Sequence, residues 1–164
     1  MSRNRRITLL GVIATIAIVL SYIEAMIPPL VAIPGVKMGL ANIAVMFALY
    51  KFGIREAAVI SIVRNIAVFL LFGGFIALIY SLAGSVLSLL VMFLLKRFLP
   101  FSEIGVSVSG GVAHNIAQIT VAIFAFSTPS LILYLPFLLI SGTVAGVLVG
   151  ITSGILIRKL KKIS

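Results

Sequence analysis

The chain alternates long runs of apolar residues with short stretches of charged or turn-forming residues. We expect a helix over each of six runs, at residues 7–27, 31–50, 57–75, 76–95, 104–126 and 131–157. A helix needs about 20 mostly apolar residues to cross a membrane, and runs of these lengths suit membrane spans. The pattern therefore predicts an all-α integral membrane protein, a six-transmembrane-helix bundle that forms a single transmembrane domain over residues 1–164.

The second run differs from the others because Pro34, Gly35 and Lys37 interrupt it. Only Met38 to Tyr50 has a clean helical pattern, which gives about 20 Å at 1.5 Å per residue against a hydrocarbon core of ~30 Å. Irregular backbone at membrane depth is tolerated where protein buries it or where it lines a cavity. The segment IPPLVAIPGVK therefore indicates either a loop folded over the mouth of a pocket or an ordinary external turn.

The composition agrees with a membrane protein. Of the residues, 62% are hydrophobic and 10% are charged, and the mean hydropathy is +1.34, whereas a soluble domain is about 45–50% apolar and about 25% charged. The N-terminal segment begins like a signal peptide, but its apolar run continues past Ser21 without a small-residue cleavage site. We therefore interpret this segment as a retained first helix.

The positive charge of the chain is placed at the edges of the apolar runs. A net charge of +10 can attract nucleic acid, but basic residues in these positions act as topology signals or bind anionic lipid. We expect a lipid membrane as the surroundings and no nucleic acid as a partner.

The distribution of Lys and Arg also predicts the orientation, since these residues gather on the cytoplasmic side. With six spans and a cytoplasmic N-terminus, every basic residue except Lys37 and Arg64 lies on that side. A five-span chain would place one of its two basic ends outside. We therefore expect a multi-pass protein of the cytoplasmic membrane with both termini cytoplasmic. The basic residues concerned are Arg3, Arg5, Arg6, Lys51, Arg55, Lys96, Arg97, Arg158, Lys159, Lys161 and Lys162.

A few ionisable and amide side chains lie within the predicted spans. An ionisable group at the bilayer centre costs about 2.5–3.5 kcal/mol, so such groups face the interior of a bundle or a cavity. At 1.5 Å per residue, Arg64 lies roughly 11 Å into the third span and His114 roughly 15 Å into the fifth. Gln118 shares a helical face with His114 and Gly111. The candidate substrate-binding residues are Lys37, Asn42, Arg64, Asn65, His114, Asn115, Gln118 and Glu24.

Each of these residues also has a purely structural interpretation. Amide side chains within spans often join helices through hydrogen bonds worth about 0.6–2 kcal/mol, and a lone histidine can do the same. No acidic residue is expected near the depth of Arg64, so either protein carbonyl and amide groups satisfy its charge or an anionic ligand does. Glu24 and Lys37 lie near the external ends of the first two spans, where they can form an ion pair.

Small residues indicate where helices approach closely. The last run has a glycine at every fourth position, which permits close contact between helix backbones. We expect this stripe to pack inside the chain; it consists of Gly142, Gly146, Gly150 and Gly154. The first run carries a looser series of small residues, where docking of a partner subunit competes with internal packing.

Several kinds of chemistry lack the residues they need. The chain has no cysteine, so it has no disulfide and no thiolate site, and it contains no phosphate-binding loop of the ATPase type. It also has no aspartate and only three glutamates, whereas a prenyl transferase needs clustered carboxylates to hold a magnesium diphosphate. His114 has no obvious carboxylate to orient it as a catalytic base. We expect no enzymatic activity, no cofactor and no metal site.

Four stretches of the sequence carry a resemblance to a known family. They are VKMGLANIAVMFALYKFG, IYSLAGSVLSLLVMFLLKR, IGVSVSGGVAHNIAQI and LPFLLISGTVAGVLVG. The chain resembles the Gx transporter family, whose members are often called heptaprenyl diphosphate synthase component I. The resemblance extends from Ile7 to Ile157, and its most specific parts are Lys37 with Gly39 and Asn42, and His114 with Asn115 and Gln118.

The resemblance implies the architecture of the S-components of energy-coupling-factor (ECF) transporters. These proteins have six helices and two cytoplasmic termini, and they hold a ligand near the external face under the loop between the first two helices. They work with a transmembrane coupling subunit and cytosolic ATPases, and small residues of the A-x-x-x-A type on the first helix contact the coupling subunit. This chain has no clean A-x-x-x-A in that region; the small residues there are Gly11, Ala14, Thr15 and Ala17.

Three functional hypotheses follow from the sequence. The first is an S-component-like subunit that captures a small anionic or amphipathic solute from outside for an ATP-driven importer. The second is a membrane anchor or accessory subunit of a prenyl diphosphate synthase. An isoprenoid-linked or quinone-precursor ligand would fit an apolar pocket with Lys37 and Arg64 at its polar end. The third is a solitary proton-coupled carrier that uses His114.

Overall fold

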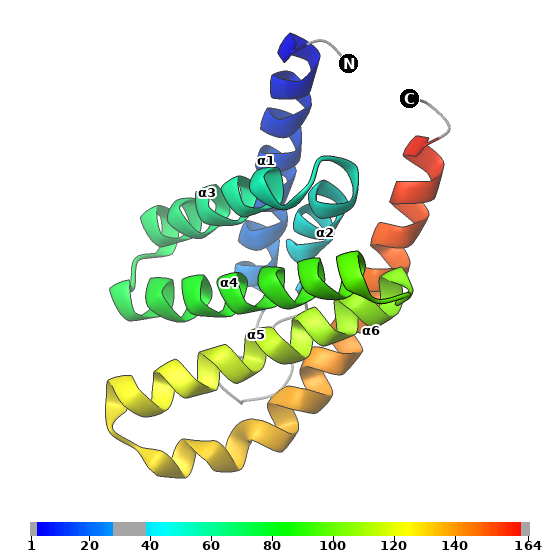
Figure 1. Cartoon of the computed structure of the whole chain (residues 1–164). Helices are drawn as coiled ribbons and strands as arrows, with labels where there is room; N and C mark the ends of the chain where they lie inside the picture. The colour runs from blue at the N-terminus through cyan, green and yellow to red at the C-terminus, as the bar shows by residue number, and fades with distance from the viewer. Residues whose placement is uncertain (1–2, 28–38, 162–164) are drawn as a thin grey trace.

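The computed structural model describes residues 3–27 and 39–161, and within these ranges the chain is almost entirely helical (Figure 1). The described residues contain six α-helices, one 3₁₀-helix and no strand. Lys37 and most of the predicted loop over the pocket, residues 28–38, lie outside the described residues. The elements are α1 (Arg3–Met26), α2 (Asn42–Lys51), α3 (Ile54–Phe72), α4 (Phe75–Phe98), α5 (Glu103–Phe126), η1 (Pro129–Tyr134) and α6 (Leu135–Lys161).

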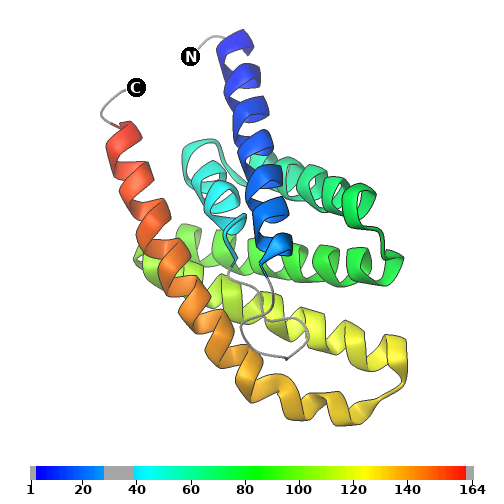
Figure 2. The ribbon, with the colours of Figure 1, turned by 180° about the vertical axis from the view of Figure 1, so that it is seen from behind.

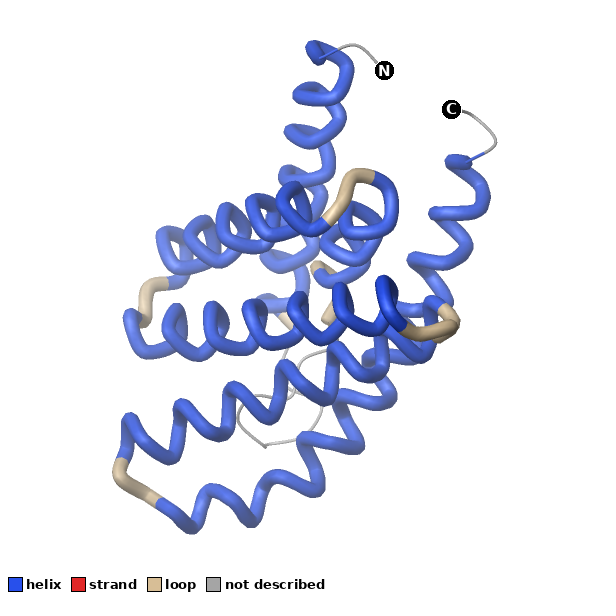
Figure 3. Tube along the Cα trace, viewed as in Figure 1, coloured by secondary structure: helices blue, strands red, loops and turns tan. Residues whose placement is uncertain are grey.

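The helices form two layers. Helices α3, α4 and α5 lie side by side as successive antiparallel neighbours (Figure 1), and the same elements seen from behind are crossed by α1, α2 and α6 (Figure 2). The short α2 lies between α1 and α6 and contacts both of them as well as α3. Helix α1 begins and α6 ends at the same end of the molecule. Figure 3 shows the short links from α2 to α3, from α3 to α4, from α4 to α5 and from α5 to η1.

Glycines make the tight link between α3 and α4. Gly73 and Gly74 have φ angles of 71° and 88°, which L-residues with a Cβ rarely adopt. The sequence pattern predicts this boundary between residues 75 and 76, and the structure moves it to these glycines because they permit the turn. At the next link, the Ser102 side chain accepts a hydrogen bond of 3.2 Å from the Gly105 N–H and caps the start of α5.

The expected irregularity of the second span is confirmed for the described residues, because α2 is a helix of only 10 residues. Its C-terminal end is held by Lys96, whose Nζ donates to the Leu49 carbonyl oxygen at 2.7 Å and lies 4.7 Å from the centre of the Tyr50 ring. A cation at this position satisfies one of the carbonyl groups that a helix leaves unpaired at its end. The short helix is thus anchored at one end to α4.

The predicted glycine stripe packs against α5 over three of its four positions. A Cβ added at Gly142 would lie 2.9 Å from the Gly111 carbonyl oxygen, and one at Gly146 would lie 2.6 Å from the Val108 Cα. Gly150 similarly faces the backbone of Ile104. These distances leave no room for a side chain, so the glycines allow the extensive α5–α6 contact. The fourth glycine, Gly154, only approaches the side chain of Arg158 and takes no part in this contact.

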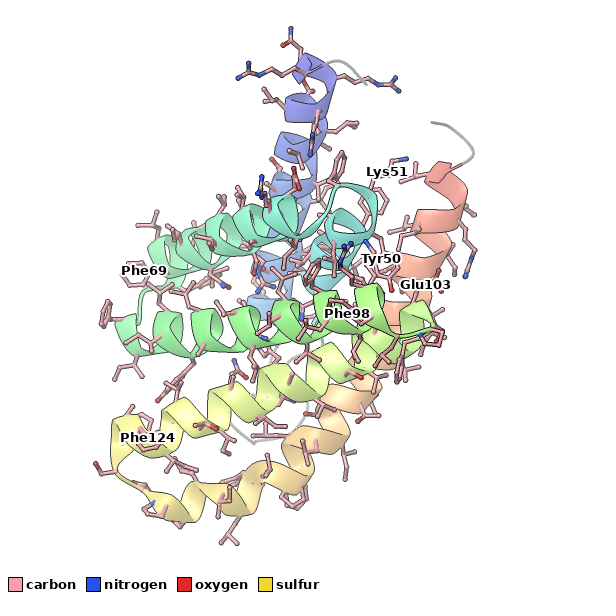
Figure 4. The ribbon with its side chains drawn as sticks, in the orientation of Figure 1. Tyr50, Lys51, Phe69, Phe98, Glu103 and Phe124 are labelled. Carbon is pink, nitrogen blue, oxygen red and sulfur yellow. The ribbon has the colours of Figure 1, made fainter. Side chains whose placement is uncertain are left out.

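The surface of the bundle is that of a membrane protein. Four described helices are long and apolar enough to cross a membrane, namely α1, α4, α5 and the η1–α6 segment. Large apolar side chains cover the outside, for example Leu70 and Phe124, which are 75% and 79% exposed. Figure 4 shows Lys51 and Glu103 near one end of the helices and Phe124 at the opposite end. The protein is therefore a multi-pass membrane protein.

Candidate functional site

A cavity of about 120 Å³ lies between the two layers of helices. Every described α-helix contributes to its lining, and most of the side chains that face it are polar. On one side it is lined by Ser21, Glu24, Ala25, Gly39, Asn42, Gly142 and Ala145, and on the other by Arg64, Asn65, Val68, Ser81, Gly111, His114, Asn115 and Gln118.

The cavity lies towards the end of the bundle that is opposite the chain ends. Glu24, in the last turn of α1, and Asn42, the first residue of α2, both line it. From α4 it receives Ser81, which is in the second turn of that helix. The start of α1 and the end of α6 lie at the other end of the bundle, away from the cavity.

Arg64 is the buried centre of the site. The residue is 8% exposed, and its guanidinium donates hydrogen bonds to Asn42 Oδ1 at 3.2 Å, to Asn65 Oδ1 at 3.1 Å and to Ser85 Oγ at 3.3 Å. All three acceptors are neutral, so they orient the cation without cancelling its charge. Nε is buried and has no hydrogen-bond partner among the described residues. Three of the five N–H groups are therefore engaged, and they hold the guanidinium in place.

Two of the predicted asparagines join helices as well as line the cavity. Asn65 Nδ2 donates to Ser85 Oγ at 2.9 Å and to the Ser81 carbonyl oxygen at 3.5 Å, which links α3 to α4. Asn115 Nδ2 donates to the Leu138 carbonyl oxygen at 2.5 Å and links α5 to α6. The structural and the ligand-binding interpretations of these residues are therefore compatible, since one side chain contacts a neighbouring helix and borders the cavity.

Glu24 brings an acidic group to the same cavity. Its Oε1 accepts a hydrogen bond from the Gly39 N–H at 2.6 Å, at a residue whose φ of 72° turns the chain into α2. Glu24 and Arg64 therefore line one cavity from different helices, and no direct ion pair joins them.

The polar face predicted on α5 points into the cavity. Gly84 of α4 makes room for it, because a Cβ at this position would lie 2.8 Å from ring atoms of His114. Gly110 of α5 similarly approaches the side chains of Met92 and Ser88 on α4. Gln118 Oε1 and Tyr80 Oη are both buried and have no hydrogen-bond partner among the described residues.

All the sequence-predicted binding residues that the structure describes line this one cavity, and Lys37 lies outside the described residues. The prediction missed the serines of α4. Ser81 borders the cavity, and Ser85 holds both Arg64 and Asn65. Their spacing of four residues places them on one helical face, and that signal was present in the sequence.

The predicted docking residues of α1 do not share one environment. Gly11 and Thr15 are exposed, and a Cβ at Gly11 would meet nothing within 4 Å. Ala14 is partly buried against the core, and Ala17 is completely buried. Ala17 is therefore a packing residue in this arrangement, because a residue without accessible surface cannot contact a partner.

Replacing Asn65 by alanine is expected to destabilise the protein by about 1–3 kcal/mol, because Ser85 and Arg64 each lose a buried partner. Thermal or denaturant unfolding in detergent measures this change. Asn4→Ala is the matched control, since Asn4 is exposed at the start of α1. Equal unfolding midpoints for the two variants would contradict a structural role for the Asn65 amide.

Comparisons with known proteins agree with the geometry. A family model described as heptaprenyl diphosphate synthase component I matches residues 13–156. Among solved structures, the fold matches that of the S component of a bacterial ECF transporter. The TM-score is 0.76 at 16% sequence identity, and the match covers 99% of this chain and 98% of the other. No curated protein matches the sequence. The bundle therefore has the fold of a transporter S component.

Proposed function

We infer that this chain, which belongs to the family described as heptaprenyl diphosphate synthase component I, is the solute-binding membrane subunit of an ATP-driven importer of the ECF type. The observation that carries the proposal is the polar cavity around Arg64, inside a bundle whose outer surface is apolar. A buried cation with an unused donor, next to a space lined by polar side chains, is suited to binding an acidic group. The S-component fold supports a role in transport.

We place all six helices in the cytoplasmic membrane, with both termini in the cytoplasm, as one transmembrane domain over residues 1–164. The basic residues at the start of α1 and at the end of α6 support this orientation. Since the cavity lies towards the opposite end of the bundle, it then opens to the outside. A solute would be captured there and released inwards after the subunit changes its orientation or shape.

The solute is small and carries an acidic group that the Arg64 guanidinium binds. His114 and Gln118 contact it from α5, while Asn42, Asn65 and Asn115 shape the space around it and hold the helices. Lys37 belongs to the same proposed set by its sequence position. Binding and release require no covalent chemistry, so we propose that the protein is not an enzyme.

The energy for transport would come from other subunits, a transmembrane coupling protein and cytosolic ATPases. The sequence lacks an ATP-binding loop, which fits such a division of labour. A docking face is offered by α1, where Gly11 and Thr15 are exposed. Beside this face, an apolar groove of about 350 Å³ runs between α1, α2 and α6, lined by residues such as Val12, Ile16 and Phe47.

Replacing Gly11 by tryptophan is expected to reduce the amount of coupling subunit that co-purifies by at least about 10-fold, which corresponds to ~1.4 kcal/mol of lost binding. The reason is that the new side chain has space in the isolated subunit but prevents a partner helix from approaching closely. Solute binding by the isolated subunit should not change. Leu70→Trp, on the lipid-facing side of α3, is the control; equal co-purification of both variants with wild type would contradict docking at Gly11.

The family description favours one other candidate, an accessory membrane subunit of a prenyl diphosphate synthase. The importer subunit would bind a small solute and energising subunits, whereas the accessory subunit would bind a synthase. Native mass spectrometry of the gently solubilised protein from its own membranes tests both. A retained small molecule together with coupling and ATPase subunits supports the importer, whereas a retained synthase without any small molecule supports the accessory subunit.

A further inference from the structure

The cavity wall carries two opposite charges, a cationic Arg64 and an anionic Glu24. Arg64 lies at its buried side, and Glu24 lies at its more exposed side, next to the start of α2. The two groups line the same space without forming a direct ion pair. A cavity with a cation and an anion at different points on its wall is complementary to a molecule that carries both charges.

We propose that the solute is a compact zwitterion, with a carboxylate or phosphate group bound at Arg64 and a cationic nitrogen bound at Glu24. This inference rests on the proposed function, because it names the class of solute that the same cavity takes. The acidic end enters first, since Arg64 is the more deeply buried partner. The cationic end then lies beside the Glu24 carboxylate, near the mouth.

Molecules with a single charge fit the cavity less well. A simple anion at Arg64 would bring a second negative charge into the space that Glu24 borders, and a simple cation at Glu24 would face the Arg64 guanidinium. Like charges within one small cavity repel most strongly where little water screens them. A zwitterion meets an opposite charge at each end.

The size and lining of the cavity favour a compact polar molecule. Its volume of about 120 Å³ is below the roughly 300–1,000 Å³ of most ligand pockets. No phenylalanine or tyrosine side chain lines it among the described residues, and Val68 is the one sizeable aliphatic residue there. An isoprenoid chain or a stacked aromatic ring would find few large apolar side chains among the described lining residues. Ser21, Ser81 and Gln118 instead offer hydrogen bonds.

The experiment uses the protein purified from its own membranes, with its bound molecule released by denaturation and identified by accurate mass and fragmentation. We expect one abundant compound with an acidic group and a basic nitrogen. Its amount per protein should fall at least about 10-fold in Glu24→Gln, a change that removes the charge but keeps an oxygen able to accept the Gly39 N–H. Glu103→Gln, the same change of charge at the start of α5 and outside the cavity lining, should retain it.

The other outcomes separate the two proposals. An anion without a basic nitrogen, bound equally well by the wild type and by Glu24→Gln, would overturn the zwitterion and leave the solute-binding function intact. If the wild-type protein releases no small molecule, both the zwitterion and the proposed function are contradicted. Far-ultraviolet circular dichroism of each variant checks that any loss of the compound is not a loss of the helices.

Discussion

Replacing Arg64 by alanine is expected to lower solute binding at least about 100-fold, or ~2.8 kcal/mol, while the helical bundle remains folded. The guanidinium is the buried cation of the cavity, and three neutral acceptors hold it in place. Hydrogen bonds to a charged group are worth about 1.5–3 kcal/mol each, and alanine removes the charge together with the donor. Equilibrium binding of the solute that the wild-type protein releases measures the loss.

Arg64→Lys provides the matched control for this experiment. It keeps a positive charge but replaces the rigid fork of donors by a single ammonium group. The bonds to Asn42, Asn65 and Ser85 cannot all be reproduced, so we expect an intermediate loss of about 10-fold. Unchanged affinity in Arg64→Ala would mean that the arginine only joins α2, α3 and α4, and the acidic-solute proposal would then fail.

The second large effect is expected at the contact between α5 and α6. Gly146→Leu should destabilise the protein by about 3 kcal/mol or more, because its Cβ would lie 2.6 Å from the Val108 Cα and backbone atoms cannot move aside as a side chain can. Separating these helices also widens the cavity at Gly111 and Gly142, which line it. We expect low yield in the membrane, an early unfolding transition and loss of solute binding.

Gly154→Leu is the control on the same stripe. A Cβ at Gly154 would approach only the end of the Arg158 side chain, at 3.4 Å, and that side chain is flexible. We expect unfolding close to that of the wild type, or a slight gain from the better helix propensity of leucine. Similar unfolding of the two leucine variants would show that the close approach of α5 and α6 is not what stabilises the fold.

The sequence was sufficient to predict the helices and most of the polar side chains that line the cavity. Hydrophobic runs determine where spans form, and buried polar groups must turn inwards in a membrane, so Arg64, His114 and Gln118 were found from position alone. Their convergence on one cavity also requires the crossing of the two helix layers, which a single run of residues does not encode.

Other features depended on contacts between distant segments. Glu24 lies near the outer end of α1, as expected, but its hydrogen bond from the Gly39 N–H and its place on the wall of the same cavity as Arg64 depend on the start of α2. Ala17 was assigned to a docking face because it is small; in the structure the same property allows α1 to pack on the core. The function of a small residue depends on which neighbour reaches it.

The shortness of the second helix has an electrostatic consequence. At 1.5 Å per residue, α2 is about 15 Å long, roughly half of a ~30 Å hydrocarbon core, and it begins at Asn42 on the cavity wall. The aligned peptide dipoles of a helix act like about half a positive charge at its N-terminus. Ala41, at the N-cap, has no side-chain oxygen to offset it. The backbone of α2 thus adds positive potential at the cavity wall, close to the Glu24 carboxylate that accepts a hydrogen bond from Gly39.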